Sequence, residues 1–340
     1  MCRHFLCDFP LSFRYQNDRA NNLGFSHIFN RLLVASLANI TKCKGSNCSQ
    51  MELTVWRGDW GLGSVSIDCL ESLAYCKLAG ALSRPVQHRK YIFTADLSAT
   101  LWHSTYGKTV IGTPAIVSYL KKGEFDLDRN LSARERADIL AYKIMVQHKL
   151  VPALNYAVWC DERNYAEVTR PAFARIVTFP LNYTVPGRLQ RVYLDELWAR
   201  FGQTANPQDV ETRLNRDARE CFLALSEKLG SSQYFFGNKA TSFDAFLFAR
   251  LSFVLKIPVP NANLVSHLKT FPNLVEFVNK IHNKHIASEV RKQRSSKERP
   301  EWIGIALSIS FAATVMFYYA FAKGILQIEF EPTSGVSSGG

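Results

Sequence analysis

The chain has 340 residues, of which 47% are hydrophobic and 21% charged, and its formal net charge at pH 7 is +12. This composition is typical of a globular protein of about two domains, and it excludes a wholly disordered, collagen-like or disulfide-scaffold chain. The eight cysteines include no Cys-x-x-Cys pair. We therefore expect reduced, structural thiols in a cytosol-facing protein rather than a zinc ribbon or a redox pair.

Residues 1–50 show no globular pattern. They carry six Lys or Arg residues against two Asp residues, a balance that also suits a mitochondrial presequence. We expect a poorly ordered extension, with the presequence as the alternative, because regular patterning begins only at Met51.

Residues 51–130 are predicted to form a small α/β domain. Residues 52–56 alternate like a strand, and a glycine-rich turn leads from them into a helix that begins near Ile67. Further strands are expected at 85–93 and 109–111, with a helix after them. This order of strands and helices is typical of an α/β fold.

Residues 131–286 are predicted to form an all-α domain. Two capping-box sequences each open a helix, and the second of these helices is apolar nearly all round, so we expect it to be buried. An amphipathic helix is expected at about 209–229, and a last one begins at Pro272. The structural capping residues are Ser132, Glu135, Thr241 and Asp244.

Residues 302–322, from Trp302 to Ala322, carry no charge. At about 1.5 Å per residue they make a helix of about 31 Å, close to the thickness of a bilayer core. We predict a transmembrane anchor here, with a buried core helix as the alternative, followed by a tail at 323–340. A basic linker at 287–301 precedes the anchor and predicts that the bulk of the chain faces the cytosol. Its targeting cations are Arg291, Lys292, Arg294, Lys297 and Arg299.

A small α/β domain, followed by an all-α domain with a capped and buried late helix, is similar to the glutathione-transferase architecture. The sequence from Thr241 to Asp244 stands where that family has a Thr/Ser-x-x-Asp capping box. The resemblance implies a thioredoxin-like N-terminal domain followed by a glutathione-transferase-like helical domain.

Three segments carry a more specific resemblance to the metaxins, a family of mitochondrial outer-membrane proteins. They lie at 51–80, with the pattern Trp-x-Gly-x-Trp-Gly-Leu-x-Ser-Val, at 164–191 and at 217–246. The resemblance covers about residues 51–286. In one departure, the family's Leu-Pro before the central hairpin is missing, because Trp102 follows Leu101.

The metaxin resemblance implies a subunit of the mitochondrial sorting and assembly machinery, which inserts β-barrel precursors into the outer membrane. The implied partners are a second metaxin, the β-barrel core subunit, precursor proteins, the lipid bilayer and mitochondrial transport adaptors. The implied location is the cytosolic face of the mitochondrial outer membrane.

A membrane-anchored glutathione-dependent transferase is the alternative function. Ser64 and Ser66 are the only candidates for a hydroxyl that stabilises the glutathione thiolate, and a turn residue and an N-cap explain them more simply. Gly112-Thr113 replaces the Glu/Gln-Ser pair that would hold the γ-glutamyl group. We therefore expect no catalytic residue and no cofactor.

Metal and nucleic-acid sites are not expected either. The histidines lack metal-ligand spacing, and we expect His282 and His285, three residues apart, to be solvated. The basic excess is dispersed apart from the linker, and no aromatic-interleaved RNA motif accompanies it.

The glycine-rich turn is the candidate partner-binding site, formed by Trp60, Gly61 and Leu62. Glycine allows close approach of another backbone, and tryptophan is a frequent interface anchor. Trp56 ends a strand and is expected to be core. The alternative interpretation is that both indoles seal the junction between the two domains.

Overall fold

The computed structural model describes most of the chain after the first fifty residues. The expected extension at 1–50, most of the anchor at 302–322 and the tail at 323–340 lie outside the described residues. The described residues are 51–81, 87–89, 98–104, 106–177, 181–202, 204–295, 306, 309–314, 316–317 and 319.

Four short strands form a mixed sheet in the order β2-β1-β3-β4. β1 (Met51–Trp56) pairs in parallel with β2 (Gln87–Arg89) and antiparallel with β3 (Thr100–His103), which pairs antiparallel with β4 (Lys108–Ile111). The missing Leu-Pro leaves this hairpin intact, because Leu101 pairs with Val110 and is fully buried.

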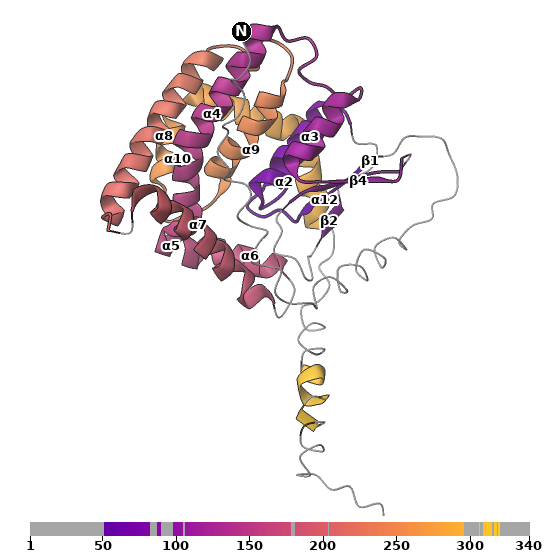
Figure 1. Cartoon of the computed structure of the whole chain (residues 1–340), viewed down its shortest axis with the longest axis vertical. Coiled ribbons are helices and arrows are strands. Elements are labelled where there is room, and N and C mark those ends of the chain that lie inside the picture. Colours follow the sequence, from indigo (N-terminus) through magenta and orange to yellow (C-terminus); the bar gives the residue numbers. More distant parts are fainter. Residues whose placement is uncertain are drawn as a thin grey trace, which may run out of the picture. The chain divides into compact units, whose positions relative to one another are not determined.

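Two helices pack against this sheet, α2 (Ile67–Leu78) and α3 (Thr113–Lys122) (Figure 1). Ser66 caps α2, since its side-chain oxygen accepts a hydrogen bond from the backbone N–H of Cys69. The order β1-α2-β2-β3-β4-α3 is the thioredoxin-like arrangement that the sequence predicts for this part of the chain.

The remaining described elements are mostly α-helices, with three π-helical turns between them. The π-helical turns are Tyr156–Cys160, Tyr165–Thr169 and His282–Ile286. The α-helices are α4 (Ala133–Asn155), α5 (Glu162–Asn164), α6 (Arg170–Ile176), α7 (Val185–Phe201), α8 (Pro207–Leu229), α9 (Ser242–Lys256), α10 (Asn263–Lys269), α11 (Pro272–Ile281) and α12 (Ala287–Ser295).

Helix α9 lies in the middle of the hydrophobic core. Every residue from Ser242 to Val254 is buried, and the helix packs against α2, α4, α10 and α11. Because α2 belongs to the α/β half and the others to the helical half, α9 joins the two halves into one hydrophobic core (Figure 1). A helix that is apolar nearly all round is stable in water only when it is surrounded in this way.

Helix α7 has no counterpart in the sequence-based prediction. Only Val185, Pro186 and Leu197 of its seventeen residues are buried. Its apolar stripe is therefore too weak to be recognised by periodicity, and contacts with α6 and the π-helical turn at Tyr156–Cys160 stabilise it instead.

The linker expected at 287–301 begins as a helix, α12, which corrects the prediction for residues 287–295. The sequence did not indicate this helix because the residues that it buries are polar: Glu289 and Gln293 lie four residues apart on one helix face and are both buried. Polar residues that face the protein interior leave no apolar periodicity in the sequence.

No helix within the described part of the chain combines the length and the apolar character that a membrane span requires. The described residues between 306 and 319 are helical, and their side chains are exposed, including Ile309, Phe311 and Phe317.

Candidate functional site

The turn that follows β1 packs against the helical half through one indole ring. Trp56 ends β1 and is fully buried, as predicted. Trp60 lies in the left-handed region, with φ at +53°, and its N–H donates to Asp59 Oδ1 at 2.8 Å. Its ring meets Phe253 of α9 edge-on at 5.8 Å. A tryptophan in this region costs roughly 1–3 kcal/mol, which the surrounding contacts must offset.

The three residues expected to contact a partner have different environments. Trp60 and Gly61 are half-buried, so part of each remains accessible. Leu62 is only 1% exposed and belongs to the core, so its expected partner contact is wrong. Sequence periodicity does not separate these positions, because they lie in a turn without regular side-chain alternation.

The hydroxyls that a glutathione transferase would use are bonded inside the protein. Ser64 is fully buried, and its Oγ accepts the N–H of Ser66 at 3.2 Å. Thr113 donates to the carbonyl of Asp68 at 2.8 Å and shares a second 2.8 Å hydrogen bond with Ser72. These hydroxyls stabilise the junction of the turn with α2 and α3.

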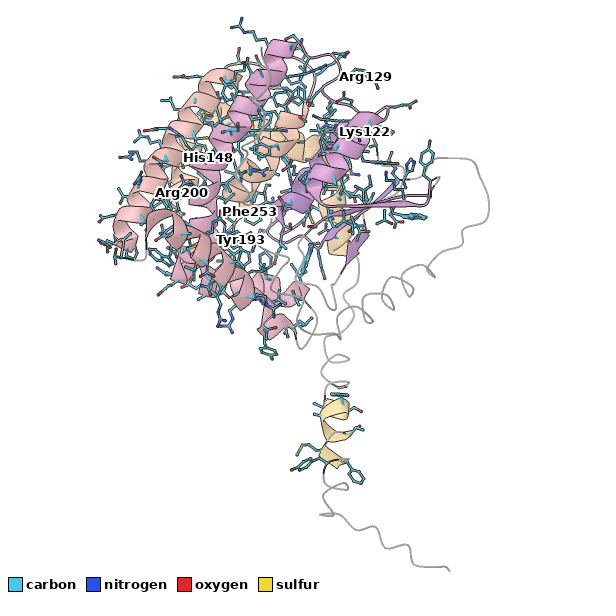
Figure 2. The ribbon with its side chains drawn as sticks, in the orientation of Figure 1. Lys122, Arg129, His148, Tyr193, Arg200 and Phe253 are labelled. Carbon is cyan, nitrogen blue, oxygen red and sulfur yellow. The ribbon has the colours of Figure 1, made fainter. Side chains whose placement is uncertain are left out.

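A cavity of about 270 Å³ lies between the turn, the start of α2 and the helices α4, α7 and α9. Four aromatic side chains are among the residues that line it, including Tyr193 of α7 and Phe253 of α9 (Figure 2). Trp159 stacks on Tyr193 with ring centroids 5.1 Å apart.

Acidic groups accompany the aromatic wall. Asp68 and Glu196 line the same cavity. Burial, with smaller contributions from these two carboxylates, raises the pKa of Tyr193 to about 12. The phenol therefore stays protonated at neutral pH, and the cavity wall carries a hydroxyl donor beside these two acidic side chains.

Arg250 is the cationic side chain among the residues that line the cavity, and it forms an ion pair inside the protein. Its Nη1 donates to Glu71 Oε2 at 2.7 Å and to the carbonyl of Phe246 at 2.8 Å. The guanidinium also lies 3.5 Å from the centroid of the Phe246 ring. This residue was missed from the sequence, although a single arginine in an otherwise apolar helix is a signal for a buried ion pair.

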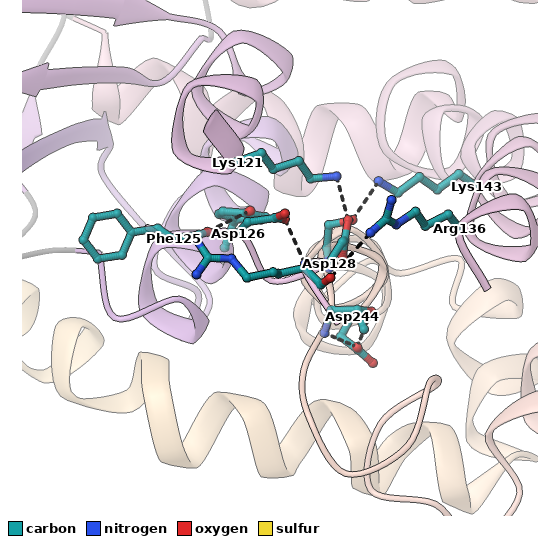
Figure 3. A network of polar contacts seen from close by, with 11 residues as sticks. Lys121, Phe125, Asp126, Asp128, Arg136, Lys143 and Asp244 are labelled. Carbon is teal, nitrogen blue, oxygen red and sulfur yellow. Dashed lines mark hydrogen bonds and ion pairs between the residues drawn. The ribbon is translucent and has the colours of Figure 1, made fainter. Parts of the chain in front are cut away.

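A second cavity, of about 400 Å³, lies beside the N-terminus of α9. The side chains of Lys121, Lys143 and Arg136 surround Asp128 there (Figure 3). Asp128 accepts from the N–H and the hydroxyl of Ser242 at 2.8 and 2.7 Å, and pairs with Lys121 at 2.6 Å. Burial alone would raise the pKa of Asp128, but these hydrogen bonds and Lys121 outweigh it, so the pKa is lowered.

The capping residues of α9 form a closed buried network. Asp244 accepts from the N–H and hydroxyl of Thr241, both at 2.7 Å, and from the N–H of Phe235 at 3.1 Å. Burial raises the pKa of Asp244 to about 6 despite these bonds. At α4, Ser132 and Glu135 form the corresponding capping box on the exposed surface. All four residues have structural roles.

The described cysteines are free thiols buried or half-buried in the core, which agrees with the sequence analysis. Burial raises the pKa of Cys69 to about 11 and that of Cys76 to about 12, so neither is a nucleophile at neutral pH. Across the described residues, no group of three or more His, Cys, Asp or Glu side chains could hold a metal ion.

The expectation that both histidines of the pair are solvated is wrong for His282, and His285 is half-buried. His282 is only 8% exposed, and burial together with Lys256 lowers its pKa to about 4. Burial also lowers the pKa of His285. Both lie in the π-helical turn before α12, where packing against α2 and α11 buries His282 and covers part of His285 although the sequence looks polar.

The targeting cations are divided between α12 and the residues after it. Arg291 and Lys292 are exposed on α12, and Arg294 lies in its last turn. Lys297 and Arg299, like the anchor ends Trp302 and Ala322, lie outside the described residues.

Comparisons with known proteins place this architecture among mitochondrial proteins. A family profile described as "Outer mitochondrial membrane transport complex protein" matches residues 69–190, and the profile of the glutathione S-transferase C-terminal domain matches residues 218–281. The second match supports a glutathione-transferase-like helical half. A glutathione S-transferase of Ceriporiopsis subvermispora, solved with glutathione, aligns with a TM-score of 0.48 and 11% identity over 70% of this chain and all of its own.

Curated relatives match over most of the chain. Metaxin-1 of Mus musculus is 35% identical over 82% of this chain and 92% of its own length. Metaxin-3 of Xenopus laevis is 37% identical over 70% of this chain and 78% of its own, and a metaxin-1 homolog of Caenorhabditis briggsae is 31% identical over 74% and 80%.

Proposed function

This chain belongs to the metaxin family, and we propose that it is a non-enzymatic docking subunit of a mitochondrial outer-membrane transport complex. Within that role we propose the sorting and assembly machinery, which inserts β-barrel proteins, with a second metaxin and the β-barrel core subunit as partners. The match to the outer-membrane transport family supports the general role.

The internal bonding of the candidate hydroxyls is the observation that favours docking over catalysis. Glutathione chemistry needs an accessible group that stabilises the thiolate, whereas Ser64 and Thr113 are buried and each already has a hydrogen-bond partner. Opening either hydroxyl to a substrate would break the contacts that hold α2 and α3.

The charged side chains that line the cavity of about 270 Å³ also favour docking over catalysis. Glutathione carries two carboxylates and one amine, so its site needs cations. This cavity has Asp68 and Glu196 on its wall, and the charge of Arg250 is paired with Glu71. An aromatic cavity lined by two carboxylates suits an uncharged or cationic segment of a partner protein better than it suits the carboxylates of glutathione.

We further propose that residues 302–322 anchor the chain and that its bulk faces the cytosol. The run of uncharged residues and the basic residues before it support this orientation. Deletion of residues 302–322 is expected to release the protein from mitochondrial membranes into the soluble fraction. A truncated chain that stays resistant to carbonate extraction would contradict the anchor.

Affinity purification of the full chain from mitochondria tests the function. We expect the second metaxin and a β-barrel outer-membrane protein to copurify, and we expect no retention on glutathione resin. Purification of the Ser64→Ala/Ser66→Ala double variant provides the control, since it should retain the same partners. Glutathione-dependent turnover that this double variant abolishes would instead establish the transferase.

A further inference from the structure

Helix α12 is fastened to the glycine-rich turn by one side chain. Gln293 Oε1 accepts the N–H of Gly58 at 3.0 Å, and its Nε2 donates to the carbonyl of Gly63 at 2.8 Å. Gln293 is buried, so both bonds are shielded from water. The amide thus bridges the two ends of a turn more than 200 residues earlier in the sequence.

A buried ion pair fixes the same helix at a second point. Glu289 is 1% exposed, and its Oε1 lies 2.7 Å from Lys77 Nζ of α2 and 3.4 Å from Lys292 Nζ. Because α2 is central to the α/β half, this pair holds α12 in a defined direction relative to the sheet.

The distance along the chain from α12 to the predicted anchor is short. Six residues, 296–301, separate Ser295 from Trp302. Fully extended, the seven steps from Ser295 to Trp302 span at most about 25 Å. If the anchor of the proposed function begins at Trp302, the end of α12 lies no farther than this maximum span from the membrane surface. Because α12 is fixed to the rest of the fold, one face of the protein is then turned toward the lipid.

The residues around the end of α12 carry positive charge. Arg57 precedes Gly58, Arg175 lies 3.3 Å from Asp59, and Arg291 and Lys292 are exposed on α12 itself. Among the described residues, two carboxylates pair with side chains of this group: Asp59 with Arg175, and the buried Glu289 with Lys292 as well as Lys77.

We propose that this face, the basic rim formed by Arg57, Arg175, Arg291 and Lys292, lies against the anionic headgroups of the bilayer and sets the orientation of the cytosolic part. The proposal rests on the anchor of the proposed function. Its supports are the fixed direction of α12, the short spacer and the complementarity of a cationic face with an anionic lipid surface.

Photocrosslinking of the full chain in liposomes tests the rim. A benzophenone amino acid replaces either Arg175, on the rim, or Arg216, exposed on α8, which packs against α4. In phosphatidylcholine with about 30% phosphatidylinositol, we expect about fivefold more lipid crosslinks from position 175 than from 216. In phosphatidylcholine alone, this ratio should fall by about half.

Each result decides between the rim and the anchor. If carbonate removes the protein from the liposomes, both the anchor and the rim are overturned. A carbonate-resistant protein with equal crosslinking at both positions would overturn the rim and leave the anchor standing. An unchanged ratio in neutral lipid would overturn the role of headgroup charge.

A variant without the buried contacts of α12 distinguishes the effect of this helix from the effect of the short spacer. Glu289→Ala/Gln293→Ala should remain carbonate-resistant but lose the difference between the two crosslinking positions, because α12 no longer fixes the direction of the chain. The exposed Gln147→Ala is the matched control and should keep the difference. An unchanged difference in the double variant would show that α12 does not orient the protein.

Discussion

Arg250 of α9 and Glu71 of α2 form an ion pair at 2.7 Å across the boundary between the helical and the α/β halves. Both side chains are largely shielded from water, at 9% and 13% exposure. The pair therefore adds a polar contact between the two halves, as Asp128 with Ser242 and Lys77 with Glu289 do elsewhere, and it withdraws the positive charge of Arg250 from the adjacent cavity.

Breaking this pair should destabilise the fold strongly. Glu71→Ala leaves a buried guanidinium without its carboxylate, and we expect a loss of about 3 kcal/mol in the free energy of unfolding. Urea unfolding followed by tryptophan fluorescence measures it. The double variant Glu71→Leu/Arg250→Met should recover most of the loss, because no unpaired charge remains. A double variant as unstable as the single one would contradict this account.

Asp244→Ala should cost about 2 kcal/mol, since it leaves the buried N–H groups of Thr241 and Phe235 without an acceptor. Glu135→Ala removes the equivalent carboxylate at the exposed start of α4 and should cost about 0.5 kcal/mol. Thermal melting of both variants checks the difference. Equal melting temperatures for Asp244→Ala and the parent would exclude this role of the carboxylate.

Gly58→Ala should prevent the turn from forming as it does here. A Cβ at this position would lie 2.0 Å from the carbonyl oxygen of Leu62, a backbone atom that cannot move independently, and 2.8 Å from Gln293 Oε1. We expect a loss of about 3 kcal/mol in denaturant unfolding. Gly187→Ala is the matched control, because its Cβ meets nothing within 4 Å inside α7, and it should gain about 0.5 kcal/mol.

The contribution of His282 to stability should fall as pH falls from about 6.5 to 4. Its folded pKa, about 4, is below the ordinary 6.5, so the unfolded chain binds a proton first and is favoured in this window. The expected contribution is on the order of 2 kcal/mol. Asp244 acts in the opposite sense, since its raised pKa adds stability as pH falls through about 6.

The pH effect of His282 is isolated by comparing variants. His282→Leu should unfold with a shallower pH dependence below 6.5 than the parent, and His148→Leu, at an exposed position, should match the parent. Identical pH profiles for all three proteins would contradict a neutral, buried His282.

Trp60→Ala tests whether the turn contacts a partner. The half-exposed indole leads us to expect about a tenfold weaker copurification with the partner metaxin, while the lost edge contact with Phe253 costs about 1 kcal/mol of stability. Trp198→Ala, on α7, removes another half-buried indole and should leave copurification unchanged. If Trp60→Ala unfolds the protein, the indole only seals the junction.

The sequence determined the features that depend on local chemistry. Hydrophobic periodicity located α8, α9 and α11, and the capping residues marked where α4 and α9 begin, because a helix terminus is satisfied by residues three positions away. The alternation in β1 and the turn after it placed Trp56 in the core for the same local reason.

Only the tertiary structure decided which polar residues are buried. Glu289, Gln293 and His282 appear in the sequence as parts of a solvated helix end and linker, yet they are enclosed because α12 folds back onto the turn and α2. The pairing of Arg250 with Glu71 likewise joins residues 179 positions apart. Contacts between segments so distant in the chain leave no periodic signal, since their partners are set by the packing of whole elements rather than by neighbouring residues.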